Sequence, residues 1–281
     1  MVERKGMHRI VSHLILILGC GLVLLPIYIA LVAASHEASE LIGNTPLWFG
    51  GRMIENVSSV LGHGLQAAGG APVWRMLVNS LIMALGIAAG KIVISLTAAF
   101  AIVYFKFPGR GICFFLIFVT LMLPVEVRIV PTFEVATNLG LIDNYMGLIL
   151  PLIASATATF LYRQFFLTIP EELLEAARID GCGAVRTYFY IYLPLSKTIL
   201  ATLTIFKTVS TWNDFFYPLI MTQSEKMKTV QLALQMFKGS TSTHYNWLMA
   251  ATLITVLPMI IVYFCAQKYF VQGVVASGMK N

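Results

Sequence analysis

Five charged side chains stand within or at the ends of long apolar runs: Lys91, Glu126, Arg128, Lys207 and Asp214. An ionised group in hydrocarbon is costly, so each is expected to serve a purpose, either by pairing with another charge or by lining a path for a polar solute. Lysine and arginine bind phosphoryl groups and other anions, and the arginine fork matches phosphate oxygens. The types of these residues therefore permit the binding of an anion.

Each of these charges also has a structural interpretation. Glu126 and Arg128 are two residues apart between Pro124 and Pro131, and can pair with each other or with a neighbouring helix. Lys91 can pair with a carboxylate of a partner subunit instead of contacting a solute. For these three residues both interpretations remain open.

Lys207 and Asp214 are seven residues apart, so they share one face of a helix about two turns apart. We interpret Lys207 as structural. Trp212 has the character of an interfacial anchor. Asn213, close to Pro218, is placed where a locally broken helix would line a pathway, as is common in transporters.

The composition places these charges in a membrane protein, because 58% of the residues are hydrophobic, 11% are charged and the mean hydropathy is +0.81. A helix crosses a hydrocarbon core of about 30 Å with roughly 20 residues. Six stretches of suitable length are predicted to span: 10–34, 76–105, 111–131, 145–163, 198–220 and 246–267.

The distribution of Lys and Arg predicts the orientation, because cytoplasmic loops carry an excess of these residues. With six spans both termini share one side, which holds 11 of the 19 Lys and Arg residues against five on the other side. Both termini are therefore predicted to be cytoplasmic, with residues 35–75 and 222–245 outside. The net charge of +6 needs no nucleic acid to explain it.

Catalytic and cofactor-binding patterns are missing from the sequence. The four cysteines are far apart and form no CxxC or Cys/His cluster, so neither a disulfide framework nor a metal site is indicated. The chain has no GxxxxGK[ST], GxGxxG, HExxH or GxSxG motif. It is therefore not expected to be an enzyme or to hold a cofactor.

The densest group of charges lies in residues 171–194, between two apolar runs, and predicts a cytoplasmic helix, turn and helix. Thr168 and Glu171 have the spacing of a capping box, so the first helix is expected to start near Ile169. Gly181 is expected to end this helix.

A second helix is expected from 184 to 192, after which Pro194 redirects the chain. By pattern alone the whole stretch is either a solvated loop on lipid headgroups or a docking surface. The small residues Ala176, Ala177 and Gly181 favour docking, because they let another surface approach closely.

This stretch resembles the EAA loop of permease subunits in bacterial ATP-binding-cassette (ABC) importers. The resemblance rests on Glu175, Ala176, Ala177, Gly181, Ile191, Leu193 and Pro194. WNDFFYPL (212–219) and QKYFVQGVVASGMK (267–280) resemble the fifth helix and C-terminal tail of the carbohydrate branch of these permeases. In this family the EAA loop docks on the ATPase subunit, so the resemblance implies a coupling role for these seven residues.

A narrower resemblance is to one permease subunit of sn-glycerol-3-phosphate importers. WRMLVNSLIMALGIAAGKIVIS, FVTLMLPVEVRIVPTFEVATNLGLIDNY and LPLIASATATFLYRQFF resemble that subunit in detail. Most sugar permeases carry uncharged residues at Lys91, Glu126 and Arg128. The resemblance therefore implies import of sn-glycerol-3-phosphate or glycerophosphodiesters, with Arg128 assisting the anion at the outer mouth. The implied pathway residues are Arg128, Glu126, Asn213, Asp214 and Lys91.

The resemblance also implies the fold and the assembly. The fold is an all-α type I ABC importer permease with six transmembrane helices in the inner membrane. It divides into an N-terminal helix and external segment (1–75), a permease core (76–270) with the coupling loop 169–196, and a cytoplasmic tail (271–281). The implied partners are a second, homologous permease, two copies of an ATPase that bind ATP and Mg, and a solute-binding protein.

Other classes of function remain to be weighed against this one. The nearest is a permease subunit for a neutral oligosaccharide or polyol. A secondary transporter can also have six helices with internal charges, but has no reason to carry the complete EAA spacing. A membrane-embedded enzyme needs a convergent catalytic set, and Glu126, Asp214 and His244 form no known motif.

Overall fold

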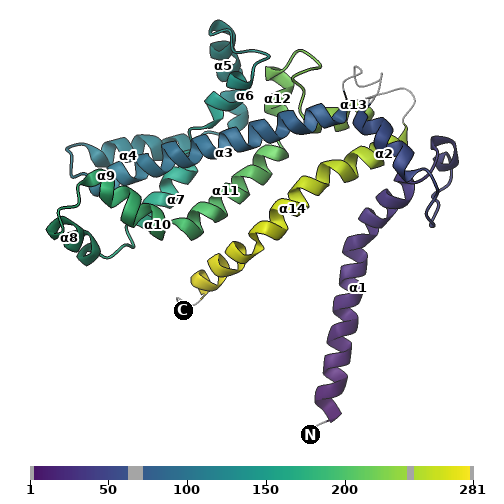
Figure 1. Cartoon of the computed structure of the whole chain (residues 1–281), viewed down its shortest axis with the longest axis horizontal. Helices are drawn as coiled ribbons and strands as arrows, with labels where there is room; N and C mark the ends of the chain where they lie inside the picture. Colours follow the sequence, from purple (N-terminus) through teal and green to yellow (C-terminus); the bar gives the residue numbers. More distant parts are fainter. Residues whose placement is uncertain (1–2, 63–71, 239–243, 279–281) are drawn as a thin grey trace. The chain divides into compact units, whose positions relative to one another are not determined.

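The computed structural model describes residues 3–62, 72–238 and 244–278, and every regular element in these ranges is a helix (Figure 1). An apolar surrounding offers no water to backbone N–H and C=O groups, so a chain of this composition satisfies them within helices. The prediction of an all-helical chain is confirmed. Parts of the predicted loops 35–75 and 222–245 and of the tail 271–281 lie outside the described residues.

The helices form two compact units, Met1–Arg75 with Ala233–Pro258 (unit 1) and Met76–Leu232 with Met259–Asn281 (unit 2). Unit 1 contains α1 (Glu3–Ala34), the 3-10 helix η1 (Ala38–Leu41), α2 (Met53–Gly62), most of α13 (Val230–Lys238) and the first part of α14 (Tyr245–Gly278).

A buried asparagine holds unit 1 together. Asn56 on α2 donates from Nδ2 to the carbonyls of Ala34 (2.8 Å) and His36 (2.9 Å) at the end of α1. Its Oδ1 accepts from Asn246 Nδ2 (3.1 Å) and Trp247 Nε1 (3.2 Å) in the first turn of α14. A buried amide is stable only with its partners in place, so Asn56 ties these three helices together.

Unit 2 carries most of the remaining helices, which share the long helix α3 (Val73–Tyr104) as their support (Figure 1). In chain order these are α4 (Arg110–Val119), η3 (Thr120–Met122), α5 (Val125–Asn138), α6 (Tyr145–Ile149), η4 (Leu150–Leu152), α7 (Ala156–Phe166), α8 (Glu171–Ile179), α9 (Ala184–Thr187), the π-helix η5 (Tyr188–Tyr192), α10 (Leu193–Leu195), α11 (Lys197–Trp212) and α12 (Phe216–Met221).

Two glycines of α3 allow the segment around η4 to lie directly against this helix. Gly86 and Gly90 are four residues apart, and small residues at this spacing let backbones approach closely in membranes. A Cβ at Gly86 would lie 2.7 Å from Ile149 Cδ1, and a Cβ at Gly90 would overlap the side chain of Ile153. The close contact therefore lies one residue before Lys91.

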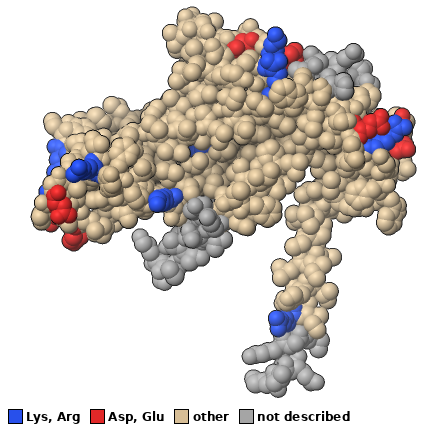
Figure 2. Space-filling view, viewed as in Figure 1, with Lys and Arg blue, Asp and Glu red and all other residues tan. Residues whose placement is uncertain are grey.

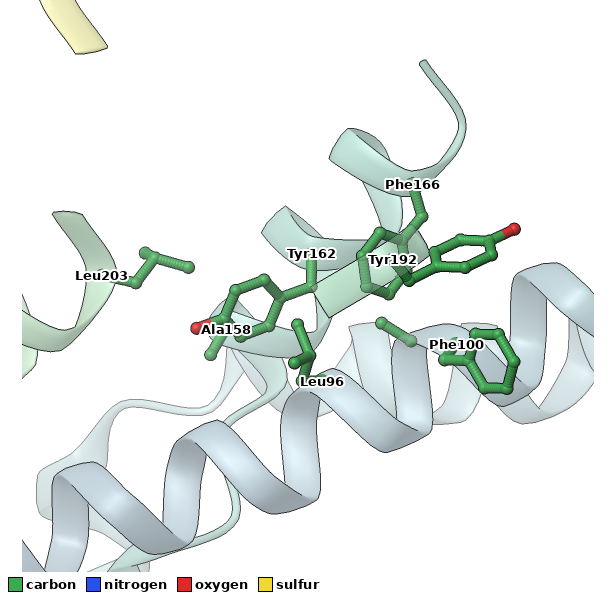
Figure 3. Packing of buried hydrophobic residues seen from close by; sticks show 8 residues of the cluster. Leu96, Phe100, Ala158, Tyr162, Phe166, Tyr192 and Leu203 are labelled. Atoms are coloured by element: carbon green, nitrogen blue, oxygen red, sulfur yellow. The ribbon is translucent and has the colours of Figure 1, made fainter. Parts of the chain in front are cut away.

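Two hydrophobic clusters lie along α3, on either side of Lys91. The aromatic cluster consists of Leu96, Ala99, Phe100, Ala158, Tyr162, Phe166, Tyr192 and Leu203 (Figure 3). The second cluster consists of Met83, Ile87, Ala136, Leu148, Tyr217 and Met221. Lys91 is therefore placed at the boundary between two packed regions.

Three helices in the described ranges are long and apolar enough to cross a membrane by length and composition: Arg9–Ala34, Val73–Tyr104 and Tyr245–Gln267. Up to five spans result if each bent pair is one span, since Tyr145–Leu152 meets Ala156–Phe166 at 44° and Ala184–Leu195 meets Lys197–Trp212 at 71°. The stretches expected to span at 111–131, 145–163 and 198–220 all contain helix breaks. The apolar surface agrees with a lipid surrounding: on the face in Figure 2, charged residues gather in a few patches, and Leu18 of α1 is 75% exposed.

A loop carboxylate joins two connections of unit 2. Asp143, which has a positive φ of 59°, donates its N–H to the Met221 carbonyl and accepts at Oδ1 from the N–H groups of Gln223 (3.0 Å) and Ser224 (2.9 Å). Burial acts to raise the pKa of this carboxyl, but the hydrogen bonds from Ser224 and Gln223 outweigh it, so the pKa lies below its usual value.

Replacing Gly90 with Val is expected to destabilise the protein, because the new side chain would overlap Ile153. Overpacking of this kind costs about 1–3 kcal/mol, which corresponds to a fall of roughly 2 to 10 °C in the melting temperature in detergent. Gly111→Val on α4 is the control, since a Cβ there meets nothing within 4 Å. Equal melting temperatures for the two variants would contradict the close contact.

Candidate functional site

A cavity of about 360 Å³ opens in unit 2 where two helical stretches are interrupted. One wall consists of η3 and the break before α5, including Thr120 and Pro124. Another consists of the break before α7 and the start of α7, including Ser155 and Ala156. Residues of α3 and α11 complete it. Interrupted helices in membrane proteins occur where their free backbone groups line a polar space, and this cavity is such a space.

Three cationic side chains line this cavity: Lys91 from α3, Arg128 from α5 and Lys207 from α11. The two lysines are half-buried and Arg128 is exposed. The ion pairs found among the described side chains are those of Arg52 and Lys228, so none of the three has a described carboxylate within 4.0 Å. Asp214 is near enough to Lys91 for their charges to attract, so among the described residues the cavity has three cations against one nearby carboxylate, a net positive charge.

Lys207, which the sequence analysis interprets as structural, lies with Lys91 at the same cavity. Both lysines also border a smaller space of about 10 Å³, lined by Tyr162 and Leu203 of the aromatic cluster. The sequence contained a signal for this, since Lys207 is a charge inside an apolar run. Its proximity to Lys91, 116 positions away, depends on the packing of α3 against α11.

Two predicted pathway residues lie outside the cavity lining. Asp214 accepts at Oδ1 from the N–H of Tyr217 (3.3 Å), which holds the first turn of α12. Asn213 donates to the Val209 carbonyl (3.0 Å) and accepts from Gln231 (3.3 Å). Both residues stabilise the break between α11 and α12. Glu126 lies on α5, but its side chain is outside the described part of the structure, and so is any pair with Arg128.

The predicted coupling segment is a helix, turn and helix with a well-defined turn. The chain leaves α8 at Gly181, whose φ of +72° favours glycine. The N–H of Gly181 donates to Arg178 O (3.0 Å) and that of Cys182 to Ala177 O (2.8 Å). This pair of bonds is a Schellman motif, so the prediction that Gly181 ends the helix is confirmed.

The predicted start of the first helix was wrong. α8 begins at Glu171 with Pro170 as its N-cap, and no side chain caps it. The Thr168 hydroxyl instead donates to the Phe165 carbonyl (2.7 Å) at the end of α7. Pro170 favours this outcome, because a residue before proline is driven out of the helical region and Ile169 cannot open the helix.

The second arm contains a wide turn. Residues 184–195 are helical, but 188–192 form a π-helix in which Leu193 N–H reaches the Tyr188 carbonyl. Pro194 has no N–H and its ring clashes with the carbonyl four residues earlier in a regular α-helix, so it favours this widening. The chain then bends by 71° between Leu195 and Lys197.

The coupling segment packs against α3 and α7 through Tyr192 and several partly buried neighbours such as Tyr188, and exposes much of the rest. Tyr192 is fully buried, and its ring lies edge-on to Phe100 (4.9 Å) and Phe166 (4.7 Å) (Figure 3). Exposed apolar side chains occur along both arms: Leu173, Ile179, Val185, Phe189 and Tyr190. Among the predicted coupling residues, Glu175, Ala176, Gly181 and Pro194 are exposed, Ile191 and Leu193 are half-buried and Ala177 is buried.

Broken membrane helices around a charged cavity, joined to a surface helix pair with exposed apolar residues, define the membrane component of a solute transporter. The family described as binding-protein-dependent transport system inner membrane component matches residues 91–276. The chain therefore belongs to this family, whose members are permeases of the inner membrane.

Several curated relatives match over the whole chain. An sn-glycerol-3-phosphate transport system permease protein UgpE from Rhizobium meliloti (strain 1021) is 46% identical over 280 residues, 99% of each chain. Proteins of the same description from Yersinia pestis bv. Antiqua (strain Antiqua) and Escherichia coli O1:K1 / APEC are 46% and 44% identical over 281 residues, again 99% of each chain.

A solved structure has the same fold. A chain of a bacterial ABC transporter involved in the import of the acidic polysaccharide alginate superposes with a TM-score of 0.80, over 96% of this chain and 99% of that chain, at 21% identity. The predicted ABC importer permease fold is therefore confirmed.

Replacing Gly181 with Val is expected to loosen the turn after α8, because a left-handed conformation costs a residue with a Cβ about 1–2 kcal/mol. Hydrogen exchange of the amides of residues 176–182 in the purified transporter should accelerate by roughly five- to thirtyfold, the factor that this free energy implies. Gly183→Val is the matched control, since Gly183 has a φ of −72° and open space around its Cα. Equal exchange in both variants would show that the turn does not depend on glycine.

Proposed function

We propose that this permease carries sn-glycerol-3-phosphate or its glycerophosphodiesters across the inner membrane, driven by ATP hydrolysis in a partner subunit. One observation carries the proposal: the cavity of a chain 44–46% identical to sn-glycerol-3-phosphate permeases is lined by three cations. A phosphate monoester brings up to two negative charges and three strong acceptor oxygens. A neutral sugar would leave the excess of positive charge at the cavity uncompensated.

The proposed assembly follows from the exposed surfaces and the family. A second homologous but non-identical permease, two copies of an ATPase and a solute-binding protein complete the transporter. ATP and Mg are bound by the ATPase, and the coupling segment 169–196 docks on that subunit, with Glu175, Ala176, Gly181 and Pro194 as the exposed members of the seven coupling residues. The exposed apolar side chains of α8 and η5, including Ile179 (86%) and Tyr190 (77%), suit such a docking surface.

The proposed topology has six spans with both termini in the cytoplasm. Residues 1–75 form the N-terminal helix and external segment, 76–270 the core and 271–281 the tail. The helix breaks at 123–124, 153–155 and 213–215 interrupt three of the six proposed spans, as is common along transport pathways. Arg128 and Lys91 line this pathway, whereas Asn213 and Asp214 support it.

The second candidate is import of a neutral oligosaccharide or polyol. The similarity of fold to an importer of an acidic polysaccharide does not decide the substrate, because the identity is 21%. The charge of the cavity favours an anion over this alternative.

Uptake by the complete transporter in proteoliposomes tests the proposed substrate. Labelled sn-glycerol-3-phosphate should accumulate with its loaded binding protein outside and ATP inside. An excess of unlabelled sn-glycerol-3-phosphate should abolish the uptake, and glycerol or maltose should leave it unchanged, because neither carries a phosphoryl group. ATP-dependent uptake of a neutral oligosaccharide without uptake of sn-glycerol-3-phosphate would contradict the proposal, and uptake of the latter without ATP would indicate a secondary transporter.

Single-cysteine labelling tests the proposed orientation, in a chain whose four native cysteines are replaced by serine. Ser39 and Asp180 are both exposed, in the predicted external segment and the coupling segment respectively. An impermeant maleimide added to spheroplasts should label Ser39→Cys at once, and Asp180→Cys only after permeabilisation. The opposite pattern would reverse the topology.

A further inference from the structure

The charges around the cavity are arranged in a way that the import function alone does not require. Lys91 and Lys207 come from different helices, α3 and α11, and border both the large cavity and the small space beneath it. Two ammonium groups held together in a poorly hydrated place repel each other, and each loses hydration. An anion between them would offset both effects.

One described carboxylate offsets these lysines only in part. Asp214, on the connection that follows α11, is near enough to Lys91 for the two charges to attract each other, but neither lysine has a described carboxylate within 4.0 Å. Among the described residues this carboxylate therefore faces an excess of cationic groups. Lys207 has a weak contact with the ring of Phe206, 5.6 Å from its Nζ. Within the described residues, the two ammonium groups are available to a ligand.

The first turn of α7 adds backbone donors to the same cavity. The Ser155 hydroxyl accepts from Ala158 N–H (3.3 Å), and the Ser155 carbonyl accepts from Thr159 N–H (3.0 Å). The N–H groups of Ala156 and Thr157 make no hydrogen bond within the described part of the chain, and both residues line the cavity. The start of a helix carries partial positive charge, which favours an anion at this point.

We propose that this cavity is a phosphoryl-binding station formed by this chain itself, in which Lys91, Lys207 and the first turn of α7 hold a phosphate monoester during transport. The inference rests on the proposed function for its substrate and adds where and how the phosphoryl group binds. The volume of about 360 Å³ falls within the range of small-molecule sites.

The station is expected to bind monoesters more tightly than diesters, although both are proposed substrates. A monoester presents three oxygens and up to two charges to the ammonium groups and the helix start. A diester presents one charge and two free oxygens, so it offsets less of the positive charge. The phosphatidylcholine headgroup is a diester as well, so we expect the phosphoryl group to come from the soluble substrate.

The reactivity of a cysteine placed in the cavity reports the charge of the cavity, and this measurement does not require transport. Thr157 is exposed, lines the cavity and is close in size to cysteine. In the complete transporter in phosphatidylcholine nanodiscs, with the native cysteines replaced by serine, Thr157→Cys should react faster with anionic sulfonatoethyl methanethiosulfonate than with the cationic trimethylammonioethyl reagent. The ratio of the two rates reports the local potential.

Lys91→Gln and Lys207→Gln should each lower this ratio by roughly fivefold, the effect of one charge several ångströms away in a partly hydrated site. Lys197→Gln is the matched control, because Lys197 is exposed at the start of the same helix α11 and does not line the cavity. Lys207→Arg keeps the charge and should therefore keep the ratio of the two modification rates. This variant remains informative if a glutamine variant fails to assemble.

Protection of Thr157→Cys from modification by a bound compound identifies the ligand of the cavity. Inorganic phosphate and sn-glycerol-3-phosphate should slow the modification of Thr157→Cys, whereas glycerol and glycerophosphocholine at equal concentration should have little effect. Lys207→Gln should raise the half-protecting phosphate concentration at least fivefold. Replacing phosphatidylcholine with a phosphate-free glycolipid should change nothing, and faster anionic modification after that change would assign the site to lipid headgroups and overturn the proposal.

The station and the proposed import function fail in different ways. Equal rates for the two reagents, or a ratio unaffected by both lysine variants, would overturn the station even if sn-glycerol-3-phosphate is imported normally. Protection by phosphate that depends on the lysines, in a transporter that imports no sn-glycerol-3-phosphate, would support the station and overturn the proposed substrate.

Discussion

The cost of leaving a backbone group or a charge unpaired in an apolar surrounding is the constraint on which this structure depends. It forces the chain into helices wherever the surface is apolar. It also means that a helix can be interrupted only where its free groups find partners or line a polar space. The breaks before α5 and before α7 both border the cationic cavity. The helix interruptions and the charged side chains therefore occur together, because both need the polar surrounding that the cavity provides.

Close packing on α3 makes this arrangement possible. Gly86 and Gly90 let the segment around Ile149 and Ile153 lie directly on the helix, and the chain then turns into α7 at Ser155. Lys91 follows Gly90 immediately, so the same contact that admits the broken segment places an ammonium group beside the start of α7. The hydrophobic clusters on either side of Lys91 hold this geometry, because their members come from several helices.

The helix α7 connects the two candidate functional regions. Its first turn lines the cavity, and its last turn carries Phe166, which packs against Tyr192 of the coupling segment. A helix of 11 residues held at both ends transmits a displacement of one end to the other as a rigid element, since its backbone bonds are internal. A movement of the coupling segment would therefore reach the cavity along α7. The π-helix beside Tyr192 is the local irregularity in this connection, and such turns are frequent at functional sites.

Composition and local pattern were sufficient for part of this description. The apolar runs determined the all-helical membrane fold, because uninterrupted runs of about 20 apolar residues satisfy their backbone groups in hydrocarbon as helices. The charge and glycine pattern of 171–194 predicted a helix, turn and helix, with the turn at Gly181, because a left-handed residue is a local property. The coupling role of this segment stays a prediction from the family resemblance. The capping box predicted at Thr168 does not form, and the reason is also local, since Pro170 prevents Ile169 from opening the helix.

Tertiary structure decided which charges share a site. Lys207 was interpreted as structural, while Asn213 and Asp214 were expected on the pathway, and the structure places Lys207 at the cavity and the other two at the break after α11. Sequence periodicity specifies the face of a helix on which a residue lies, but not the helix that this face meets. That pairing depends on packing between residues far apart in the chain, such as Gly90 against Ile153 and the aromatic cluster that contains Leu96 of α3, Ala158 of α7 and Leu203 of α11.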